Sequence, residues 1–419
     1  MTVTLDALEK ARPSGGLFAG KNWLSSPEPL RLSRRHRRFL DQLGPTLAAF
    51  QKAQDRIYRR SVKGGVTPWV AEVLDQGKPD WLLEWQRRGD QAEVVPRVIR
   101  PDLLLTSDGF AVSELDSVPG GIGLTAWLNQ SYPEVIGGSE GMVEGFRSIL
   151  PKEATVWVSE ESQDYRPEME WLCEQLQGVT VSSAEDWDGS PGYRFFELFD
   201  WQSILGLAKI AEAGNLTPPL KPHFEEKAWL ALLHAPGLRK VWQQELRGKQ
   251  LELLKACVPL GWVVDPAPLP PQASFPGMEL QSWQEVGELS QQQRRLVLKI
   301  SGFSEQAWGS RGVFVGHDEP GERWAQLVQQ ATEQFGTQPW MMQRFCDAEA
   351  FEHPYFHPET GKVETMEVRA RLCPYYFINS KEEVGLGGCL ATLAPVDKKK
   401  IHGMEDAILV PVADEASLR

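Results

Sequence analysis

The sequence lacks the marks of several large protein classes. It has no run of about 18 apolar residues, so no segment is suited to span a membrane as a helix. Its five cysteines are scattered without a C-x-x-C pair, which is typical of reduced thiols rather than of a disulfide scaffold. The 44 basic residues are outnumbered by 57 acidic ones, which argues against a broad basic surface for nucleic acids or anionic membranes. We therefore expect a cytoplasmic protein with neither kind of partner.

Several catalytic motifs are also missing. No Walker pattern G-x-x-x-x-G-K-[ST] and no Ser/His/Asp set stands out, and His353 and His357 flank a proline without a partner cluster for zinc. The segment Gly121-Ile-Gly-Leu-Thr-Ala126 imitates a dinucleotide fingerprint, yet no βαβ unit surrounds it. A nucleotide-dependent oxidoreductase is therefore disfavoured. As the start of a helix, the same turn is a candidate site for a substrate carboxylate.

The 419 residues, 42% of them hydrophobic, suffice for two or three packed lobes. Apolar residues at spacings of three and four predict a helix from Arg34 through Ile57. Short apolar runs alternating with helical patterns predict an α/β lobe over 154–210. A proline-rich stretch at 265–271 marks a boundary. We expect three parts, listed by range: a mainly helical segment (1–93), a metal-binding hairpin with an α/β substrate lobe (94–270), and a nucleotide-binding lobe (271–419).

The most informative segment is a predicted hairpin that carries charged residues. A three-residue turn at 107–109, closed by a glycine, would pair Asp102 with Glu114 and Arg100 with Asp116. All four side chains then share one side of the hairpin, and opposed Cβ atoms lie about 5 Å apart. Carboxylates that close repel unless a cation such as Mg²⁺ lies among them, and the arginine fork suits phosphate oxygens. A solvated acidic hairpin with an offsetting arginine explains the pattern equally well.

A second candidate site follows a lysine in an apolar strand. Lys299 lies within the predicted strand 296–300 and needs either an anion or a route to solvent. The loop after it carries Ser301, Gly309 and Gly312, and glycines let backbone N–H groups approach phosphate oxygens. Gln343 ends a later strand, where a purine could find a donor and an acceptor. An edge-strand lysine, an ordinary flexible loop and core packing remain the alternatives.

Alternation in a later predicted strand, 364–372, places Glu367, Arg369 and Arg371 on one face. Two arginines beside a carboxylate are suited to phosphates or to an acidic substrate. A surface ion-pair ladder would have the same pattern.

Taken together, these segments resemble the circularly permuted ATP-grasp ligases, in particular the synthetase domain of glutathionylspermidine synthetase. That family's pattern is R-x-D, about a dozen residues, then E-x-N. Here it stands as Arg100-Pro-Asp102, eleven residues, then Glu114-Leu-Asp116, with Lys299 later in the chain. The resemblance implies a mixed α/β fold with a nucleotide cleft between sheet lobes. It departs from the family at Asp116, where an asparagine is expected, and in lacking a clear second nucleotide lysine before position 362.

By that resemblance, Asp102, Glu114 and Asp116 hold Mg²⁺, Arg100 stabilises the phosphoryl group in transfer, and ATP is bound by Lys299, Ser301, Gly309, Gly312, Gln343 and Arg371. The expected activity is an ATP- and Mg²⁺-dependent ligase that joins a small-molecule or peptide carboxylate to an amine through an acyl phosphate. A kinase with the same phosphate chemistry and a non-catalytic nucleotide-binding protein stay open. The sequence names neither substrate and leaves the oligomeric state open.

Overall fold

A computed structural model describes residues 3–19, 22–65, 67–204, 206–210, 216–270, 273–307, 309, 311–398 and 405–415, with the side chains of 209 and 210 left out. The chain forms two compact units. Unit 1 comprises Met1–Ala48, Val95–Pro219 and Asp347–Arg419, and unit 2 comprises Ala49–Val94 and Leu220–Cys346. Both mix helices with sheets, so the predicted mixed α/β class is confirmed. The three-part division expected from the sequence stays a prediction.

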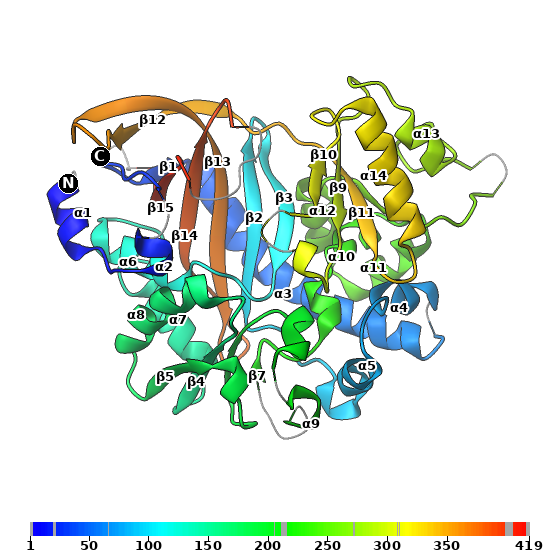
Figure 1. Ribbon diagram of the computed structural model, residues 1–419, viewed down its shortest axis with the longest axis horizontal. Coiled ribbons are helices and arrows are strands. Elements are labelled where there is room, and N and C mark those ends of the chain that lie inside the picture. The colour runs from blue at the N-terminus through cyan, green and yellow to red at the C-terminus, as the bar shows by residue number, and fades with distance from the viewer. Residues whose placement is uncertain are drawn as a thin grey trace. The chain divides into compact units, whose positions relative to one another are not determined.

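Unit 1 contains a seven-stranded sheet and a smaller, parallel sheet, together with helices (Figure 1). Its helices are α1 (Leu5–Ala11), α2 (Gly16–Ala19), the first half of α3 (Arg34–Val62), α6 (Ile122–Ser131), α7 (Gly141–Ile149), α8 (Arg166–Glu174) and α9 (Leu207–Ile210). Its strands are β1 (Leu30–Leu32), β2 (Val98–Thr106), β3 (Gly109–Asp116), β4 (Ala154–Val158), β5 (Val179–Ser183), β6 (Gly192–Phe195), β7 (Leu216–Thr217), β12 (Ala350–Phe356), β13 (Val363–Ile378), β14 (Val384–Pro395) and β15 (Ile408–Asp414).

The large sheet of unit 1 runs in the order β1-β15-β14-β13-β2-β3, and β12 pairs with β13. Helices cover both of its faces. Tyr376 packs against Gly44 of α3, where a Cβ would meet its ring at 2.4 Å, whereas the next residue, Phe377, packs against Gly145 of α7. Neighbouring strand residues point to opposite faces. Helix α3 therefore covers one face and α7 the other, and the strands between them are buried.

The smaller sheet of unit 1 has the order β5-β4-β6-β7, and all its pairs are parallel. Parallel pairing requires a crossover, and helix α8 provides the one between β4 and β5. The α/β lobe predicted over 154–210 is therefore confirmed in its strands and in the helix predicted at 166–177.

Unit 2 holds an antiparallel sheet in the order β10-β9-β11-β8, together with several α-helices. Its strands are β8 (Gly261–Val263), β9 (Leu296–Ile300), β10 (Val313–Val315) and β11 (Trp340–Arg344). Its helices are the second half of α3, α4 (Trp69–Leu74), α5 (Asp80–Arg87), α10 (Ala228–Leu232), α11 (Arg239–Glu245), α12 (Gly248–Cys257), α13 (Trp283–Gly287) and α14 (Gly321–Glu333).

The two faces of the unit 2 sheet differ in chemistry. Leu298 and Met342 belong to a buried cluster with Trp324 and Leu327 of α14, so this face forms the core. Lys299 alternates with Leu298 and therefore points to the opposite face. On that face the neighbouring element is α10, which packs against β8 and β11.

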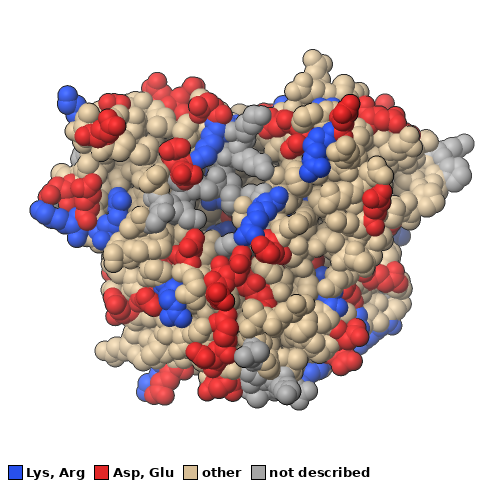
Figure 2. Space-filling model, in the orientation of Figure 1, with Lys and Arg blue, Asp and Glu red and all other residues tan. Residues whose placement is uncertain are grey.

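The surface agrees with the composition. Figure 2 shows acidic side chains spread over the visible face, with basic ones scattered among them rather than gathered into a broad patch. Within the part of the chain that the structure describes, no helix is both long and apolar enough to cross a membrane.

Candidate functional site

The predicted hairpin is formed by β2 and β3, and its register at the charged residues is the predicted one: Asp102 faces Glu114 and Arg100 faces Asp116. The turn itself differs from the prediction, because Thr106 pairs with Gly109 across two residues rather than three. A β-bulge between Asp102 and Leu103 adds one residue on β3 and restores the register. We call the side formed by Arg100, Asp102, Glu114 and Asp116 the carboxylate face.

Arg100 is the centre of the carboxylate face. Its Nη2 donates to Asp116 Oδ2 at 2.8 Å, and its Nε lies 3.1 Å from Asp102 Oδ1 in an ion pair. Asp102 is almost fully buried, with 4% of its surface exposed. Buried charges of this kind persist only when they are paired. The arginine and the two aspartates thus neutralise one another in a preformed arrangement.

Strand β13 brings Arg371 to the same carboxylate. Arg371 Nη1 donates to Asp102 Oδ2 at 3.2 Å, and the Cys373 thiol donates to Asp102 Oδ1 at 3.4 Å. Arg371 was expected to help bind the nucleotide, and in the structure its hydrogen-bond partners include Asp102 and Thr392. Cys373 was not foreseen, because the predicted strand ended at 372. Alternation from Arg371 would have found it.

The electrostatics of the carboxylate face follow from this burial. Burial alone would lower the pKa of Arg100, but the neighbouring charges of Asp102 and Asp116 raise it well above its usual value. The pKa of Asp116 is raised, first by burial and then by the nearby charge of Glu114, against the opposing effect of Arg100. The raised pKa of Asp116 therefore reflects mainly its burial, with repulsion from Glu114 as a lesser cause.

The carboxylates offer the hard oxygen ligands that Mg²⁺ prefers. As they are arranged, however, no three His, Cys, Asp or Glu side chains among the described residues could together hold a metal ion. Asp102 and Asp116 already pair with guanidinium groups. An ion at one or two of these carboxylates would therefore need its other ligands from elsewhere, as protein-bound Mg²⁺ commonly takes them from substrate phosphates and water.

The second candidate site, in unit 2, joins two of the predicted residues. Lys299 lies on β9, a central strand between β10 and β11, so the edge-strand alternative is wrong. Its Nζ donates to Gln343 Oε1 at 3.1 Å, and the two residues are 6% and 2% exposed. Because Lys299 faces Met341 across the ladder, Gln343 is its diagonal neighbour on the same side of the sheet.

The loop after Lys299 is anchored at its root. Ser301 is fully buried, and its hydroxyl donates to Glu226 and accepts the N–H of Ala228 at 2.8 Å. Gly312 is held tightly as well, because a Cβ there would meet Gln306 O at 2.7 Å. Gly309 is exposed and has a positive φ of 63°. Two other positions of this predicted loop, 308 and 310, lie outside the described residues.

Comparison with solved structures shows the fold. The chain shares its fold with a glutathione synthetase-like effector from Globodera pallida. That structure, determined in the apo form, aligns with a TM-score of 0.56 over 98% of this chain and 96% of its own, at 10% identity. A putative gamma-glutamylcysteine synthetase from Methylobacillus flagellatus KT aligns with a TM-score of 0.40 over 84% of this chain and 83% of its own, at 9% identity. No protein-family model and no curated protein sequence matches the chain.

In this fold, the turn that imitates a dinucleotide fingerprint has another use. Helix α6 begins at Ile122, three residues before the predicted Thr125, and Gly121 precedes it with a φ of 84°. Two backbone N–H groups at this turn are hydrogen-bonded within the protein. Glu168 Oε1 accepts from Gly121 N at 2.7 Å, and Glu168 Oε2 accepts from Leu124 N at 2.9 Å. The hypothesis of a substrate carboxylate at these amides is therefore wrong.

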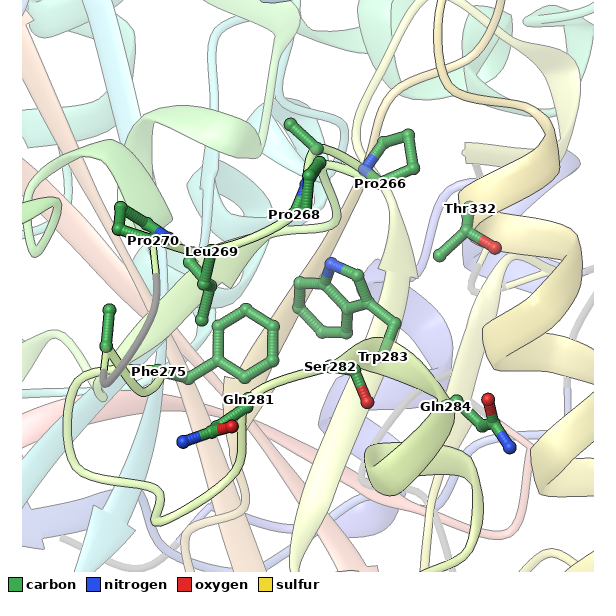
Figure 3. Close-up of a pocket in the computed structure, with 12 residues that line it drawn as sticks. Pro266, Pro268, Leu269, Pro270, Phe275, Gln281, Ser282, Trp283, Gln284 and Thr332 are labelled. Carbon is green, nitrogen blue, oxygen red and sulfur yellow. The ribbon is translucent and has the colours of Figure 1, made fainter.

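The proline-rich stretch predicted as a boundary lines a cavity of about 410 Å³ in unit 2 (Figure 3). The rings of Phe275 and Trp283 lie there, with centroids 4.5 Å apart. The other lining residues are Pro266, Ala267, Pro268, Leu269, Pro270, Ala273, Gln281, Ser282, Gln284 and Thr332. None of these side chains carries a charge, so this cavity offers nothing for phosphate chemistry.

Proposed function

We propose that the protein is an ATP- and Mg²⁺-dependent ligase that forms an amide bond between a carboxylate and an amine. The observation that carries the proposal is the gathering of three carboxylates and two guanidinium groups on β2, β3 and β13. Such a set suits a triphosphate and its metal ion. The fold shared with a glutathione synthetase-like effector supports the same class.

The proposed reaction has two steps. An oxygen of the substrate carboxylate attacks the γ-phosphorus of ATP; the new P–O bond forms as the bond to ADP breaks, giving an acyl phosphate. The amine nitrogen then attacks the activated carbonyl carbon, the C–O bond to phosphate breaks, and the amine loses a proton to solvent. Water must be excluded, because it would hydrolyse the acyl phosphate.

Arg100 is proposed to stabilise the transferring phosphoryl group. Its Nε is buried and, among the described residues, has no acceptor in hydrogen-bond geometry, although Asp102 pairs with it electrostatically at 3.1 Å. A phosphoryl oxygen can take that N–H. A donor already fixed by its neighbours is effective because it need not reorganise as charge develops. Arg371, which shares Asp102, is proposed as a second phosphate contact.

Mg²⁺ is proposed to enter bound to ATP, with Glu114, Asp116 and Asp102 as the protein carboxylates available to it, and when bound it would neutralise phosphate charge. In unit 2, Lys299 is proposed to contact the phosphates and Gln343 the adenine. The loop that carries Ser301, Gly309 and Gly312 is proposed to close over the phosphates as a lid, with Ser301 as its fixed root.

We further propose that the fold is the circularly permuted ATP-grasp arrangement, close to that of glutathionylspermidine synthetase. The order of the motifs supports this, since the carboxylate hairpin precedes Lys299 in the chain. Either a small molecule or a peptide would supply the carboxylate.

The proposal is tested by incubating the protein with Mg²⁺-ATP and pools of amino acids, peptides, diamines and polyamines, followed by ADP measurement and mass spectrometry of the products. The proposal predicts ADP release that needs both an acid and an amine, with an amide as product. A phosphorylated product without an amine requirement would favour the kinase. Nucleotide binding without turnover by any pool would favour the non-catalytic alternative.

A further inference from the structure

Glu168 is a fully buried carboxylate that the proposed reaction does not use. It lies on α8 and caps the start of α6 through the N–H groups of Gly121 and Leu124. Its own backbone approaches the same turn, because a Cβ on Gly123 would meet Glu168 O at 2.1 Å. A glycine is therefore required at position 123. Glu168 thus contacts the start of α6 with both its side chain and its backbone.

The other side of the turn is held by the carboxylate face. Gly120 O accepts from Arg100 Nη1 at 3.0 Å and from the Tyr375 hydroxyl at 2.7 Å. The same Tyr375 hydroxyl would lie 2.7 Å from a Cβ on Gly121. Each nitrogen of the Arg100 guanidinium thus has a fixed neighbour: Asp102 at Nε, Asp116 at Nη2 and Gly120 at Nη1.

We infer that Glu168 is a positioning residue for Arg100, acting through the Gly120–Gly121 turn. The inference rests on the proposed function, because Arg100 is the group whose position matters to phosphoryl transfer. The chain of contacts is continuous: the carboxylate fixes the Gly121 N–H, the peptide unit between the two glycines fixes Gly120 O, and that oxygen fixes one end of the guanidinium. Displacing a catalytic group by about 1 Å can cost about 100-fold in rate.

The electrostatic surroundings agree with this role. Burial raises the pKa of Glu168 to about 7, against the opposing effects of the backbone N–H groups and of Arg100. An acid that is costly to bury needs a specific compensation. Glu168 interacts electrostatically with Arg100 from β2, Tyr375 from β13 and Tyr165 from the segment before α8.

The test compares Glu168→Gln with Glu170→Gln, a change on the exposed side of the same helix, where the carboxylate pairs with Arg166 at the surface. The glutamine keeps the size of the side chain, but its NH₂ group cannot accept a backbone N–H. We expect the NMR signal of the Arg100 Nε–H to shift in E168Q and to stay in place in E170Q. With turnover assayed, we expect kcat to fall about 10- to 100-fold while KM for ATP is unchanged, as for an interaction that matters in the transition state.

Restoring the carboxylate on a shorter stem, in Glu168→Asp, should recover part of the lost kcat. An Arg100 signal that does not move in E168Q would overturn the inference, and so would unchanged kcat in an active E168Q enzyme. If the Arg100 signal shifts in E168Q but the wild-type protein turns over no pair of acid and amine, the proposed ligase activity is overturned and the positioning role is left intact.

Discussion

Replacing Asp102 with alanine should destabilise unit 1 far more than replacing any exposed acid of the same hairpin. Asp102 is the shared partner of Arg100 and Arg371, whose side chains are only 15% and 13% exposed. Its loss leaves two buried guanidinium groups with one fewer anion, and breaking a buried pair in this way costs about 3–5 kcal/mol. Because Arg100 keeps Asp116, we expect the lower end, about 3 kcal/mol.

Hydrogen exchange measured on peptides from β2 and β13 is a suitable assay, since these strands pair directly. A loss of about 3 kcal/mol corresponds to exchange about 100-fold faster or more. Asp108→Ala, in the exposed turn, is the matched control and should change the free energy by about 0.5 kcal/mol or less. Adding Arg371→Met to D102A should recover part of the loss, because it removes an uncompensated buried charge. Equal exchange in D102A and D108A would refute the reasoning.

Three further outcomes are expected. Lys299→Met should weaken ATP binding about 10-fold or more in calorimetry, by loss of a phosphate contact worth about 1.5–3 kcal/mol, whereas the exposed Lys362→Met should not; equal affinities would remove Lys299 from the site. Asp116→Asn should change the activation free energy of turnover by no more than about 1 kcal/mol, since an amide oxygen can still accept the Val118 N–H. Asp116→Ala should lose turnover, and equal turnover rates of the two variants would contradict this. Glu168, with its pKa raised from 4.5 to about 7, stabilises the fold fully only below pH 4.5, and this stabilisation is lost as the pH rises through 7. Between pH 4.5 and 7, the free energy of unfolding of the wild type should therefore fall by about 3 kcal/mol relative to that of E168Q, as measured by denaturation. Free energies of unfolding that change equally with pH in the two proteins would exclude this effect.

Periodicity sufficed for much of the fold. The helix from Arg34, the strands of the α/β lobe and the pair of strands around Lys299 all stand where spacing of apolar residues placed them. The spacing of apolar residues failed to predict structure that depends on contacts between residues far apart in the sequence. Helix α6 begins before Thr125 because Glu168, 47 residues from Gly121, satisfies its first N–H groups. No local propensity reveals that cap, and Gly123 near the start of the helix, just after Gly121, argues against a helix there.

The carboxylate hairpin was predicted correctly at the charged residues through two compensating differences. The turn is one residue shorter than expected, and a bulge near Ser113 returns the register. A bulge depends on pairing that the local sequence does not encode. Strand β13 continues beyond the predicted end at 372 and passes through Pro374, a residue that usually interrupts strands. It is tolerated where the pairing of β13 with β2 skips from Leu372 to Tyr376, so no N–H is missed there.

The central claim is that the carboxylate face and Lys299 serve one ATP-dependent amide-forming reaction. The most direct measurement gives the enzyme an acid labelled with ¹⁸O in its carboxylate, Mg²⁺-ATP and an amine from the active pool, and analyses the released phosphate by mass spectrometry. The account predicts one ¹⁸O atom in each phosphate, formed in step with ADP and amide, and loss of the signal in both D102N and K299M. Phosphate without label, or full activity in either variant, would contradict it.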